Sequence, residues 1–259
     1  MTARVLITRE AGSWPALETR FASSPIVLQW DPTTSQVPPL DPRPGEEAVG
    51  RLERYDWLVV ASVRGVEALT RTLTDAGVAA PPPELRVAAV GPATARAMTS
   101  AGFTVTLVAG EATSNGLAAS LRPHVAQGAR VLVVGPEGPP GALARTLRAG
   151  SAQVHEAPLY RTVASARAPE LAGEAIAGRF AAVTFTAPSA LTLWLEAAGA
   201  QSDELAAALA TLKRVAIGPT TEARLASSGL AASAVAESPT EVAVGDAIAR
   251  ALPAFHLLT

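Results

Sequence analysis

The stretch Val215-Ala-Ile-Gly-Pro-Thr-Thr-Glu-Ala-Arg-Leu-Ala-Ser-Ser-Gly229 decides the predicted fold, because it contains a complete strand, turn and helix. A short apolar run leads into Gly218, and an Ala-rich amphipathic segment then closes at Gly229, where a helix stop is favoured. Pro219 suits the first helical position, because a backbone N–H would be unpaired there in any case. The same pattern occurs earlier, in Val87-Ala-Ala-Val-Gly-Pro-Ala-Thr-Ala-Arg-Ala-Met-Thr-Ser-Ala-Gly102. Two such units in one chain indicate an internal duplication.

The bulk composition excludes several classes of protein. The 259 residues are 49% hydrophobic and 17% charged, which suits one large domain or two ordinary ones. A net charge of −2 without runs of like charge gives no sign of nucleic-acid binding. There is no cysteine, and the three histidines are scattered, so we expect neither disulfides nor a metal site. With no signal peptide or spanning stretch apparent, we expect a soluble cytoplasmic protein without a membrane partner.

Apolar runs typical of strands alternate with amphipathic segments typical of helices along the whole chain. Besides the two quoted units, we expect strands at 4–8, 26–30, 55–62, 103–108, 130–135, 153–157, 181–186 and 232–236. We expect helices at 14–21, 62–76, 142–150, 170–178, 188–198 and 239–252, and another that opens at 113–117. Many of the strands are continuous apolar runs, which is typical of parallel sheets covered by helices on both faces.

Two further segments are predicted to be linkers. Segment 31–44 is rich in proline, and such a segment is not expected to carry a helix or a central strand. We interpret it, together with segment 158–164, as an extended connection.

Three short phrases recur in the same order and define the duplication. They are Ala61-Ser-Val-Arg-Gly-Val66 with Thr186-Ala-Pro-Ser-Ala-Leu191, Gly91-Pro-Ala-Thr94 with Gly218-Pro-Thr-Thr221, and Val108-Ala-Gly-Glu-Ala-Thr-Ser-Asn115 with Val235-Ala-Glu-Ser-Pro-Thr-Glu241. The first copy is followed by two more predicted strands, whereas the second copy finds its two at the start of the chain. We therefore predict an α/β domain made of 1–30 plus 165–259, with a second domain, 45–157, inserted in it. Each would be flavodoxin-like, with a parallel sheet of five strands in the order 2-1-3-4-5.

Several phrases spread over nearly the whole chain together resemble the uroporphyrinogen-III synthase family. They are Thr8-Arg9, Asp56 with Ser62-Val-Arg-Gly-Val66, Val90-Gly-Pro-Ala-Thr94, Tyr160-Arg-Thr162, Phe185 with Pro188-Ser189, Ala216-Ile-Gly-Pro-Thr-Thr221 and Ser238-Pro-Thr-Glu241. The resemblance implies a hydro-lyase of heme and tetrapyrrole biosynthesis, with no cofactor. Such an enzyme closes linear hydroxymethylbilane into uroporphyrinogen III, with loss of water and inversion of the terminal pyrrole ring through a spiro-pyrrolenine intermediate. It implies an active site in the inter-domain cleft. We expect a monomer that makes transient contact with the preceding enzyme of the pathway.

The Gly-Pro-x-Thr turns have two interpretations. Thr94, Thr220 and Thr221 could cap their helices, which is a common role of threonine at a helix start. Alternatively, the unpaired N–H groups and positive dipole end of each helix could bind carboxylates of the substrate, which carries eight of them. Helix starts at the carboxyl ends of parallel strands are where open α/β sheets bind ligands.

The resemblance places a tyrosine over the cleft at Tyr160, whose phenol could donate a hydrogen bond to the departing hydroxyl; packing alone is the other interpretation. A phenol is ordinarily protonated at neutral pH and so donates rather than accepts a proton. Ser62 either caps a helix or also contacts substrate. Arg9, Arg64 and Arg161 could pair with carboxylates or be merely solvated.

Ser189 is a further candidate for substrate binding. Two positions depart from the family pattern: Ala187 stands where the family often has serine, and segment 135–141 lacks an arginine that the family often carries. These departures leave open a non-catalytic homologue that binds a tetrapyrrole or other small polyanion as a sensor. A solute-capturing binding protein is a further alternative, although it would normally need an export signal.

Overall fold

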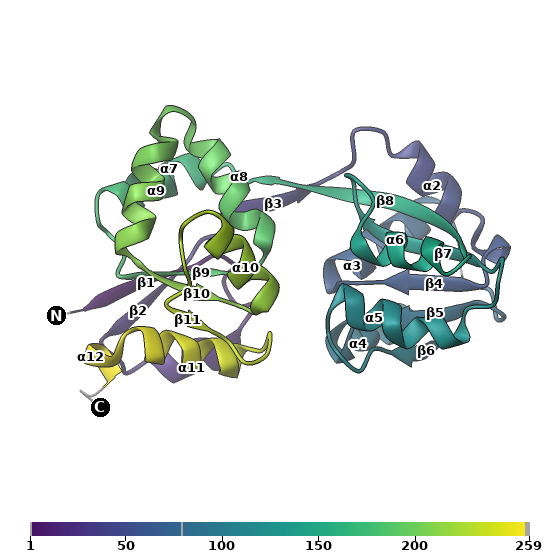
Figure 1. The fold of residues 1–259 in the computed structure, drawn as a ribbon, viewed down its shortest axis with the longest axis horizontal. Helices are drawn as coiled ribbons and strands as arrows, with labels where there is room; N and C mark the ends of the chain where they lie inside the picture. The colour runs from purple at the N-terminus through teal and green to yellow at the C-terminus, as the bar shows by residue number, and fades with distance from the viewer. Residues whose placement is uncertain (1, 79, 257–259) are drawn as a thin grey trace. The chain divides into compact units, whose positions relative to one another are not determined.

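The computed structural model describes residues 2–78 and 80–256, and it divides into two compact units (Figure 1). Unit 1 contains the residues up to Ser35 and those from Val163 onward, and unit 2 is the continuous segment Gln36–Thr162. Each unit contains a sheet of mostly parallel strands flanked by helices, which confirms the predicted α/β fold class.

The sheet of unit 1 has five strands in the order β11-β10-β9-β1-β2, and all of its ladders are parallel. The strands are β1 (Ala3–Ile7), β2 (Ile26–Trp30), β9 (Ala182–Phe185), β10 (Lys213–Ala216) and β11 (Ala234–Val235). Numbered within the unit, this order is 2-1-3-4-5, as predicted. The start of the chain therefore pairs with a strand from its last third, because Val5 lies opposite Ala182.

The sheet of unit 2 has six strands in the order β3-β8-β7-β4-β5-β6, one more than the five predicted, because part of the segment predicted to be a linker adds the edge strand β3. The strands are β3 (Thr34–Val37), β4 (Trp57–Val60), β5 (Arg86–Ala89), β6 (Val105–Val108), β7 (Arg130–Pro136) and β8 (Gln153–Ala164). Apart from β3, they are arranged in space as in unit 1, but β7 and β8 come last in the unit where their counterparts β1 and β2 come first. The two units are thus circular permutations of one arrangement.

The two segments predicted to be extended linkers contain regular structure, and the division between the units falls within each of them. Segment 31–44 contains β3 and the start of helix α2 (Arg43–Val49), and β8 continues through segment 158–164. The prolines are compatible with both elements. The strand β3 has no proline of its own and lies at the edge of the sheet, and Pro44 lies in the first turn of α2, where its missing N–H breaks no helical bond.

Helices occupy most of the remaining chain. In unit 1 they are α1 (Pro15–Phe21), α7 (Ala168–Ile176), α8 (Pro188–Ala198), α9 (Ser202–Thr211), α10 (Pro219–Ser227), α11 (Glu241–Ala251) and α12 (Pro253–His256), with a short 3-10 turn at Gly199–Gln201. In unit 2 they are α2, α3 (Val63–Asp75), α4 (Pro92–Ser100), α5 (Ser114–Leu121) and α6 (Ala142–Ala149), with 3-10 turns at Leu52–Arg54 and Arg122–His124. In the described part of the chain, no helix has both the length and the apolar character needed to cross a membrane.

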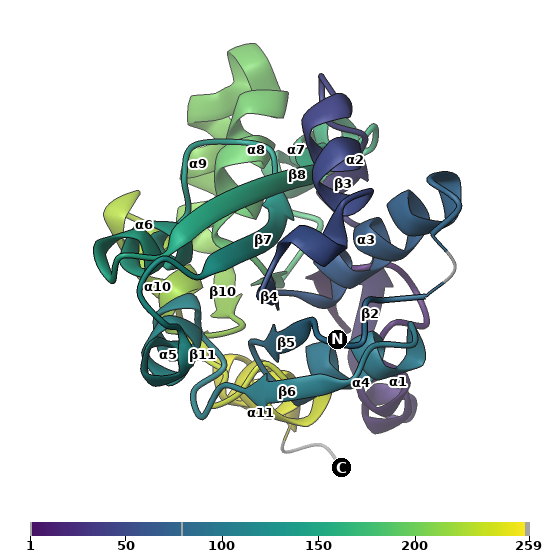
Figure 2. The same ribbon diagram turned by 90° about the vertical axis from the view of Figure 1, so that its right-hand side faces the viewer.

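Both faces of each sheet are buried. Along β4, Leu58 and Val60 belong to one apolar cluster, with α3 and α4, whereas Trp57 and Val59 belong to another, with α5 and α6. Figure 2 shows α5 and α6 on one side of this sheet and α2, α3 and α4 on the other. Burial of a side chain of this size contributes about 1.5–3 kcal/mol, so these continuous apolar strands hold the two helical layers together.

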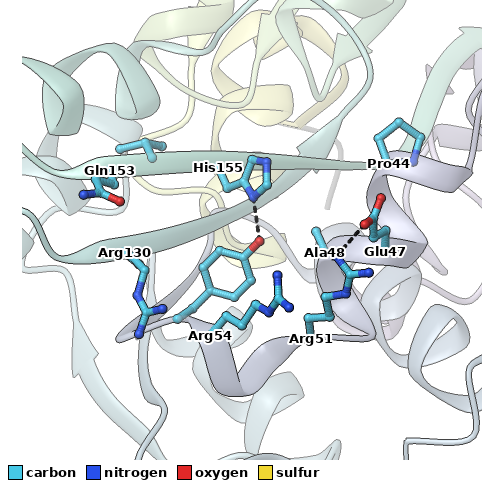
Figure 3. A pocket seen from close by; sticks show the side chains of 10 residues that line it. Pro44, Glu47, Ala48, Arg51, Arg54, Arg130, Gln153 and His155 are labelled. Atoms are coloured by element: carbon cyan, nitrogen blue, oxygen red, sulfur yellow. Dashed lines mark hydrogen bonds and ion pairs between the residues drawn. The ribbon is translucent and has the colours of Figure 1, made fainter.

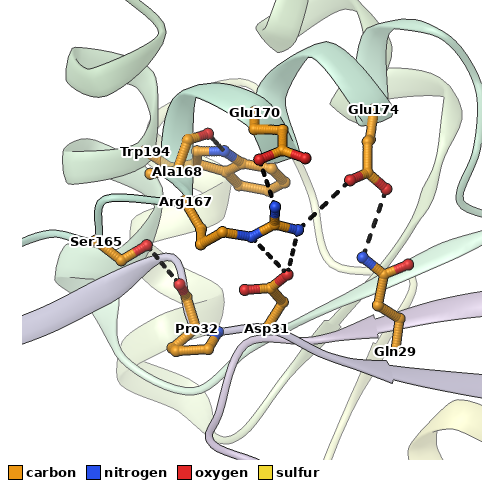
Figure 4. A network of polar contacts seen from close by, with 9 residues as sticks. All are labelled: Gln29, Asp31, Pro32, Ser165, Arg167, Ala168, Glu170, Glu174 and Trp194. Carbon is orange, nitrogen blue, oxygen red and sulfur yellow. Dashed lines mark hydrogen bonds and ion pairs between the residues drawn. The ribbon is translucent and has the colours of Figure 1, made fainter.

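A polar network in unit 1 joins the two places where the chain leaves and re-enters that unit (Figure 4). The Arg167 guanidinium donates to the Asp31 carboxylate at 2.8 Å and also pairs with Glu170. The Ser165 hydroxyl donates to the Pro32 carbonyl at 2.6 Å, and the Ser165 N–H donates to the Thr33 carbonyl at 3.0 Å. The two crossings between the units are therefore tied to each other within unit 1.

Candidate active site

The predicted site residues lie in or near turns that follow the carboxyl ends of the strands. Ser62 and Arg64 follow β4, and Thr94 follows β5. In unit 1, Ser189 and Thr221 follow β9 and β10 in the same way. Because neighbouring strands are parallel, these residues gather at one edge of each sheet.

Tyr160 and Ser62 are brought together in unit 2. The phenolic oxygen of Tyr160 lies 3.5 Å from the hydroxyl oxygen of Ser62, and either group could be the donor. The Tyr160 residue is only 7% exposed and packs in the apolar cluster between the sheet and α3. It pairs with Pro136 after a register shift between β7 and β8, so its position depends on that irregularity.

Ser62 caps helix α3. Its side-chain oxygen accepts the Gly65 N–H at 3.0 Å, while its backbone is extended as an N-cap requires. A Cβ added at Gly65 would lie 3.1 Å from Val60 Cγ1 and 3.4 Å from the Ser62 oxygen, so glycine keeps this turn close to the sheet. Since the oxygen is engaged as an acceptor, the Ser62 O–H remains available to donate to Tyr160 or to a ligand.

The threonines of the Gly-Pro turns do not cap their helices. The N-cap residues are Gly91 and Gly218, so neither helix start has a side-chain cap. Thr94 and Thr221 are the third residues of α4 and α10, only 3% and 2% exposed, and within the described chain neither side chain forms a hydrogen bond. Thr220 is exposed. The capping interpretation was therefore wrong, and both helix starts keep unpaired N–H groups at their positive ends.

The three candidate arginines differ in what they contact. The Arg9 guanidinium lies 4.5 Å from the centre of the Trp14 ring, which favours a cation–π contact. Arg161 donates from Nε to the Pro38 carbonyl at 3.2 Å. Arg64 is half-buried in the first turn of α3 and, among the residues described, has neither an ion pair nor a hydrogen bond from its side chain.

Unit 1 presents a less polar turn after β9. Helix α8 begins at the N-cap Ala187, which has no hydroxyl, and Ser189 is exposed in the first turn of that helix. Sequence reasoning missed a buried pair at this edge: the Thr8 hydroxyl donates to the Thr184 carbonyl at 2.7 Å, and the Thr8 N–H donates to the Thr184 hydroxyl at 3.2 Å. The available signal was a threonine at the end of each of two adjacent apolar strands.

A cavity of about 430 Å³ lies at the carboxyl edge of unit 2. Its lining includes most of the 135–141 loop, together with Ala61 next to Ser62 and Pro158 near Tyr160. No arginine or lysine is among the described residues that line it. Of its two carboxylates, Glu156 pairs with Arg148 at 2.8 Å, and Glu137 accepts the Leu40 N–H at 3.2 Å. The described lining of the cavity therefore supplies no positive side chain, and the arginine that contacts this loop is Arg145, which donates to the Pro140 carbonyl from outside the lining.

Each of the two α/β units has a mostly parallel sheet, with hydroxyl side chains and open helix starts at its carboxyl edge. These features define a two-domain α/β protein of the kind that binds small molecules at strand ends. The sequence profile described as uroporphyrinogen-III synthase HemD matches residues 30–246. The chain therefore belongs to the uroporphyrinogen-III synthase family, which acts in heme and tetrapyrrole biosynthesis.

Solved structures with a similar fold carry the same family name. A mutant uroporphyrinogen III synthase from the extremely thermophilic bacterium Thermus thermophilus matches with a TM-score of 0.67 and 22% identity, over 98% of this chain and 100% of that one. The enzyme from Helicobacter pylori matches with a TM-score of 0.58 and 15% identity, over 95% of this chain and 97% of that one. At these identities the likeness establishes the fold. Among curated proteins, none matches the sequence.

Proposed function

We propose that this chain is a cofactor-free hydro-lyase that closes hydroxymethylbilane into uroporphyrinogen III, with loss of water and inversion of the terminal pyrrole ring. The observation that carries the proposal is the family match over residues 30–246. The contact between Tyr160 and Ser62 supports it, because it supplies a positioned hydroxyl donor at the edge where such sheets bind ligands.

In the proposed reaction, Tyr160 donates a hydrogen bond to the hydroxyl that leaves the substrate. The electron-rich pyrrole nitrogen pushes this group out, so the enzyme needs to assist departure rather than to remove a proton. Ser62 acts as a positioning residue, because its oxygen is held by the Gly65 N–H and its hydroxyl faces the phenol. Most of the rate enhancement would then come from holding the terminal ring against the attacking position.

The substrate carboxylates would be bound chiefly by backbone N–H groups. The starts of α4 and α10 lack side-chain caps, and each is followed within one turn by a buried threonine whose hydroxyl is unbonded in the described structure. Such helix starts favour anions through their N–H groups and their dipole. Arg64 would add one bidentate contact. Arg9, Arg161, Ser189 and Thr220 complete the proposed set of binding residues, so that both units supply substrate contacts.

A second candidate function is supported by two observations. Ala187 leaves the α8 start of unit 1 without a hydroxyl, and the cavity beside the 135–141 loop has no basic residue in its described lining. A protein with weakened contacts of this kind could bind a tetrapyrrole or another small polyanion as a sensor without converting it. The two functions differ in whether product forms.

The decisive experiment is incubation of the purified protein with enzymatically generated hydroxymethylbilane, followed by oxidation and chromatographic separation of the isomers. We expect the type III isomer in excess over the type I isomer, which forms spontaneously. Type I alone, accompanied by saturable binding of uroporphyrinogen, would support the sensor instead. For the cellular setting, we propose a cytoplasmic monomer that meets the preceding enzyme of the pathway transiently; size-exclusion chromatography with light scattering tests the monomer.

A further inference from the structure

Unit 2 has a second cavity, of about 570 Å³, at the edge of the sheet opposite to Tyr160 (Figure 3). Its lining residues Arg54 and Tyr55 come just before β4, Arg130 is the first residue of β7, and Gln153 is the first residue of β8. The cavity therefore lies at the amino ends of the strands. The proposed reaction makes no use of it.

The charge lining this cavity is predominantly positive. Arg51, Arg54 and Arg130 line it with one carboxylate, Glu47, which pairs with Arg51 at 2.5 Å. Within the described residues, the guanidinium groups of Arg54 and Arg130 have no acidic partner. Figure 3 shows Arg130 and Gln153 at one end of the pocket and Glu47 with Arg51 at the other. The positive groups are thus spread over both ends.

Two polar side chains that contact each other line the cavity between these ends. The Tyr55 hydroxyl and His155 Nδ1 lie 2.6 Å apart, and their rings are in contact, with centroids at 5.9 Å. Burial raises the pKa of the Tyr55 phenol, while the neighbouring Arg54 and Arg51 charges oppose that rise, which places those charges close to the phenol. Pro44, Ala48 and Val154 supply apolar walls.

The corresponding position in unit 1 is a natural comparison. The ladders place Trp57 opposite Val131 in unit 2 and Ala182 opposite Val5 in unit 1. Trp57 is thus equivalent to Ala182, and Val131 is equivalent to Val5. Counted back along each strand, Arg54 corresponds to Arg179, Tyr55 to Phe180 and Arg130 to Arg4. These three residues of unit 1 also line a cavity. By the same strand registers, Gln29 of unit 1 occupies the position equivalent to His155 of unit 2. Unit 1 therefore keeps two of the arginines but lacks the phenol, the imidazole and a counterpart of Arg51 in its described lining.

We propose that the amino-edge cavity of unit 2 binds a compact organic polyanion that carries two or more phosphate or carboxylate groups. One anionic group pairs with Arg130, and another pairs with Arg54 and Arg51, since arginine binds both kinds of anion through paired hydrogen bonds. The Tyr55 and His155 pair contacts the ligand between them. This inference does not depend on the proposed reaction, because it uses different residues at the other edge of the sheet.

The test is calorimetric titration of the full-length protein with pyrophosphate and, separately, with citrate, at constant ionic strength. We expect saturable binding of at least one of them, with one site per chain. Tighter binding of pyrophosphate would assign the site to phosphate compounds, and tighter binding of citrate would assign it to polycarboxylates. The double variant Arg54→Gln/Arg130→Gln should weaken binding by about tenfold or more, because each lost charged hydrogen bond carries much of the affinity.

The matched control is Arg4→Gln/Arg179→Gln, which removes the same two charges from the equivalent positions of unit 1. We expect this variant to bind as the unaltered protein does. Equal weakening by both double variants would show only non-specific attraction to positive charge and would overturn the proposal, as would the absence of saturable binding. Weakening by Arg64→Gln alone would move the site to the carboxyl edge and also overturn it. Circular dichroism and thermal unfolding verify that every variant is folded.

Discussion

The two units share one arrangement of strands but differ in the side chains at their carboxyl edges. The ladders align Ser62 of unit 2 with Ala187 of unit 1, so one helix start has a hydroxyl cap and the other has none. In contrast, Thr94 and Thr221 are the same residue in the same buried place, each after a Gly-Pro turn without a side-chain cap. The shared feature is the open helix start, and Tyr160 with Ser62 is special to unit 2. The helix starts proposed to bind anions are thus duplicated, whereas the proposed chemistry is confined to one unit.

The largest effect that this comparison predicts is from Tyr160→Phe. Removal of the phenolic oxygen takes away the proposed donor to the leaving hydroxyl, so we expect kcat to fall about tenfold or more while KM changes little. The ring itself remains, and the lost contact is a single long hydrogen bond, so the free energy of unfolding should change by less than about 1 kcal/mol. Initial rates of type III formation and urea denaturation measure the two quantities. An unaltered kcat would remove Tyr160 from the mechanism and leave unit 2 without special chemistry.

The next prediction exchanges the two helix caps. Ser62→Ala removes the acceptor of the Gly65 N–H and should lower the free energy of unfolding by about 1 kcal/mol. Ala187→Ser places a hydroxyl on a backbone that is already extended, with φ −156° and ψ 149°. This substitution should raise the free energy of unfolding by up to about 1 kcal/mol. Urea denaturation of the two variants beside the unaltered protein measures both changes.

Measurements of activity distinguish the role of Ser62 as a helix cap from its proposed role in positioning Tyr160. If Ser62 also orients the phenol, Ser62→Ala should lower kcat several-fold, and Ser62→Thr, which keeps the hydroxyl, should restore most of it. A loss of stability with full activity in Ser62→Ala would reduce Ser62 to a cap, and the contrast with unit 1 would then concern stability alone.

Sequence patterns predicted most of the fold because it depends on local signals. Buried strands in α/β units are continuous apolar runs, and a Gly-Pro turn after such a run starts a helix, so the two quoted stretches located β5 with α4 and β10 with α10. The paired phrases also led to the permuted arrangement, because each phrase belongs to a strand end. Helix α9 (Ser202–Thr211) was missed; it breaks the alternation of strand and helix and buries only Leu205 and Leu209.

The candidate site could be predicted only in part, because its details depend on long-range geometry. The sequence places Tyr160 after a strand. Its contact with Ser62, however, follows from a register shift between β7 and β8, and no local sequence pattern predicts that shift. Similarly, Arg161 remains a proposed carboxylate-binding residue, but the hydrogen bond from its Nε to the Pro38 carbonyl joins distant parts of the sequence and had no local signal. Capping was one of the two interpretations of the threonines, because threonine often caps helices, whereas glycines occupy the N-cap positions.

The smallest predicted effect concerns the amino edges, where Tyr55 of unit 2 corresponds to Phe180 of unit 1. In a Tyr160→Phe background Tyr55 is the only tyrosine, since the chain has two, so ultraviolet absorbance of tyrosinate follows it alone. Burial raises its pKa above the ordinary value of 10.0, and Arg54 opposes the rise by favouring the phenolate. Arg54→Gln should therefore raise the pKa of Tyr55 further.

A matched control for this titration is Arg71→Gln, because Arg71 is exposed on α3, does not line the cavity and is not among the charges that act on Tyr55. This variant should leave the pKa of Tyr55 unchanged, because the charge of an exposed side chain that does not contact the phenol is screened by salt. Because the neutral phenol is favoured in the folded state, stability should decline as the pH rises past the ordinary pKa, where an unfolded chain would already ionise. A fall in the pKa of Tyr55 on removal of Arg54 would mean that the guanidinium does not favour the phenolate, and the phenol that distinguishes the amino edge of unit 2 would then lie outside its reach.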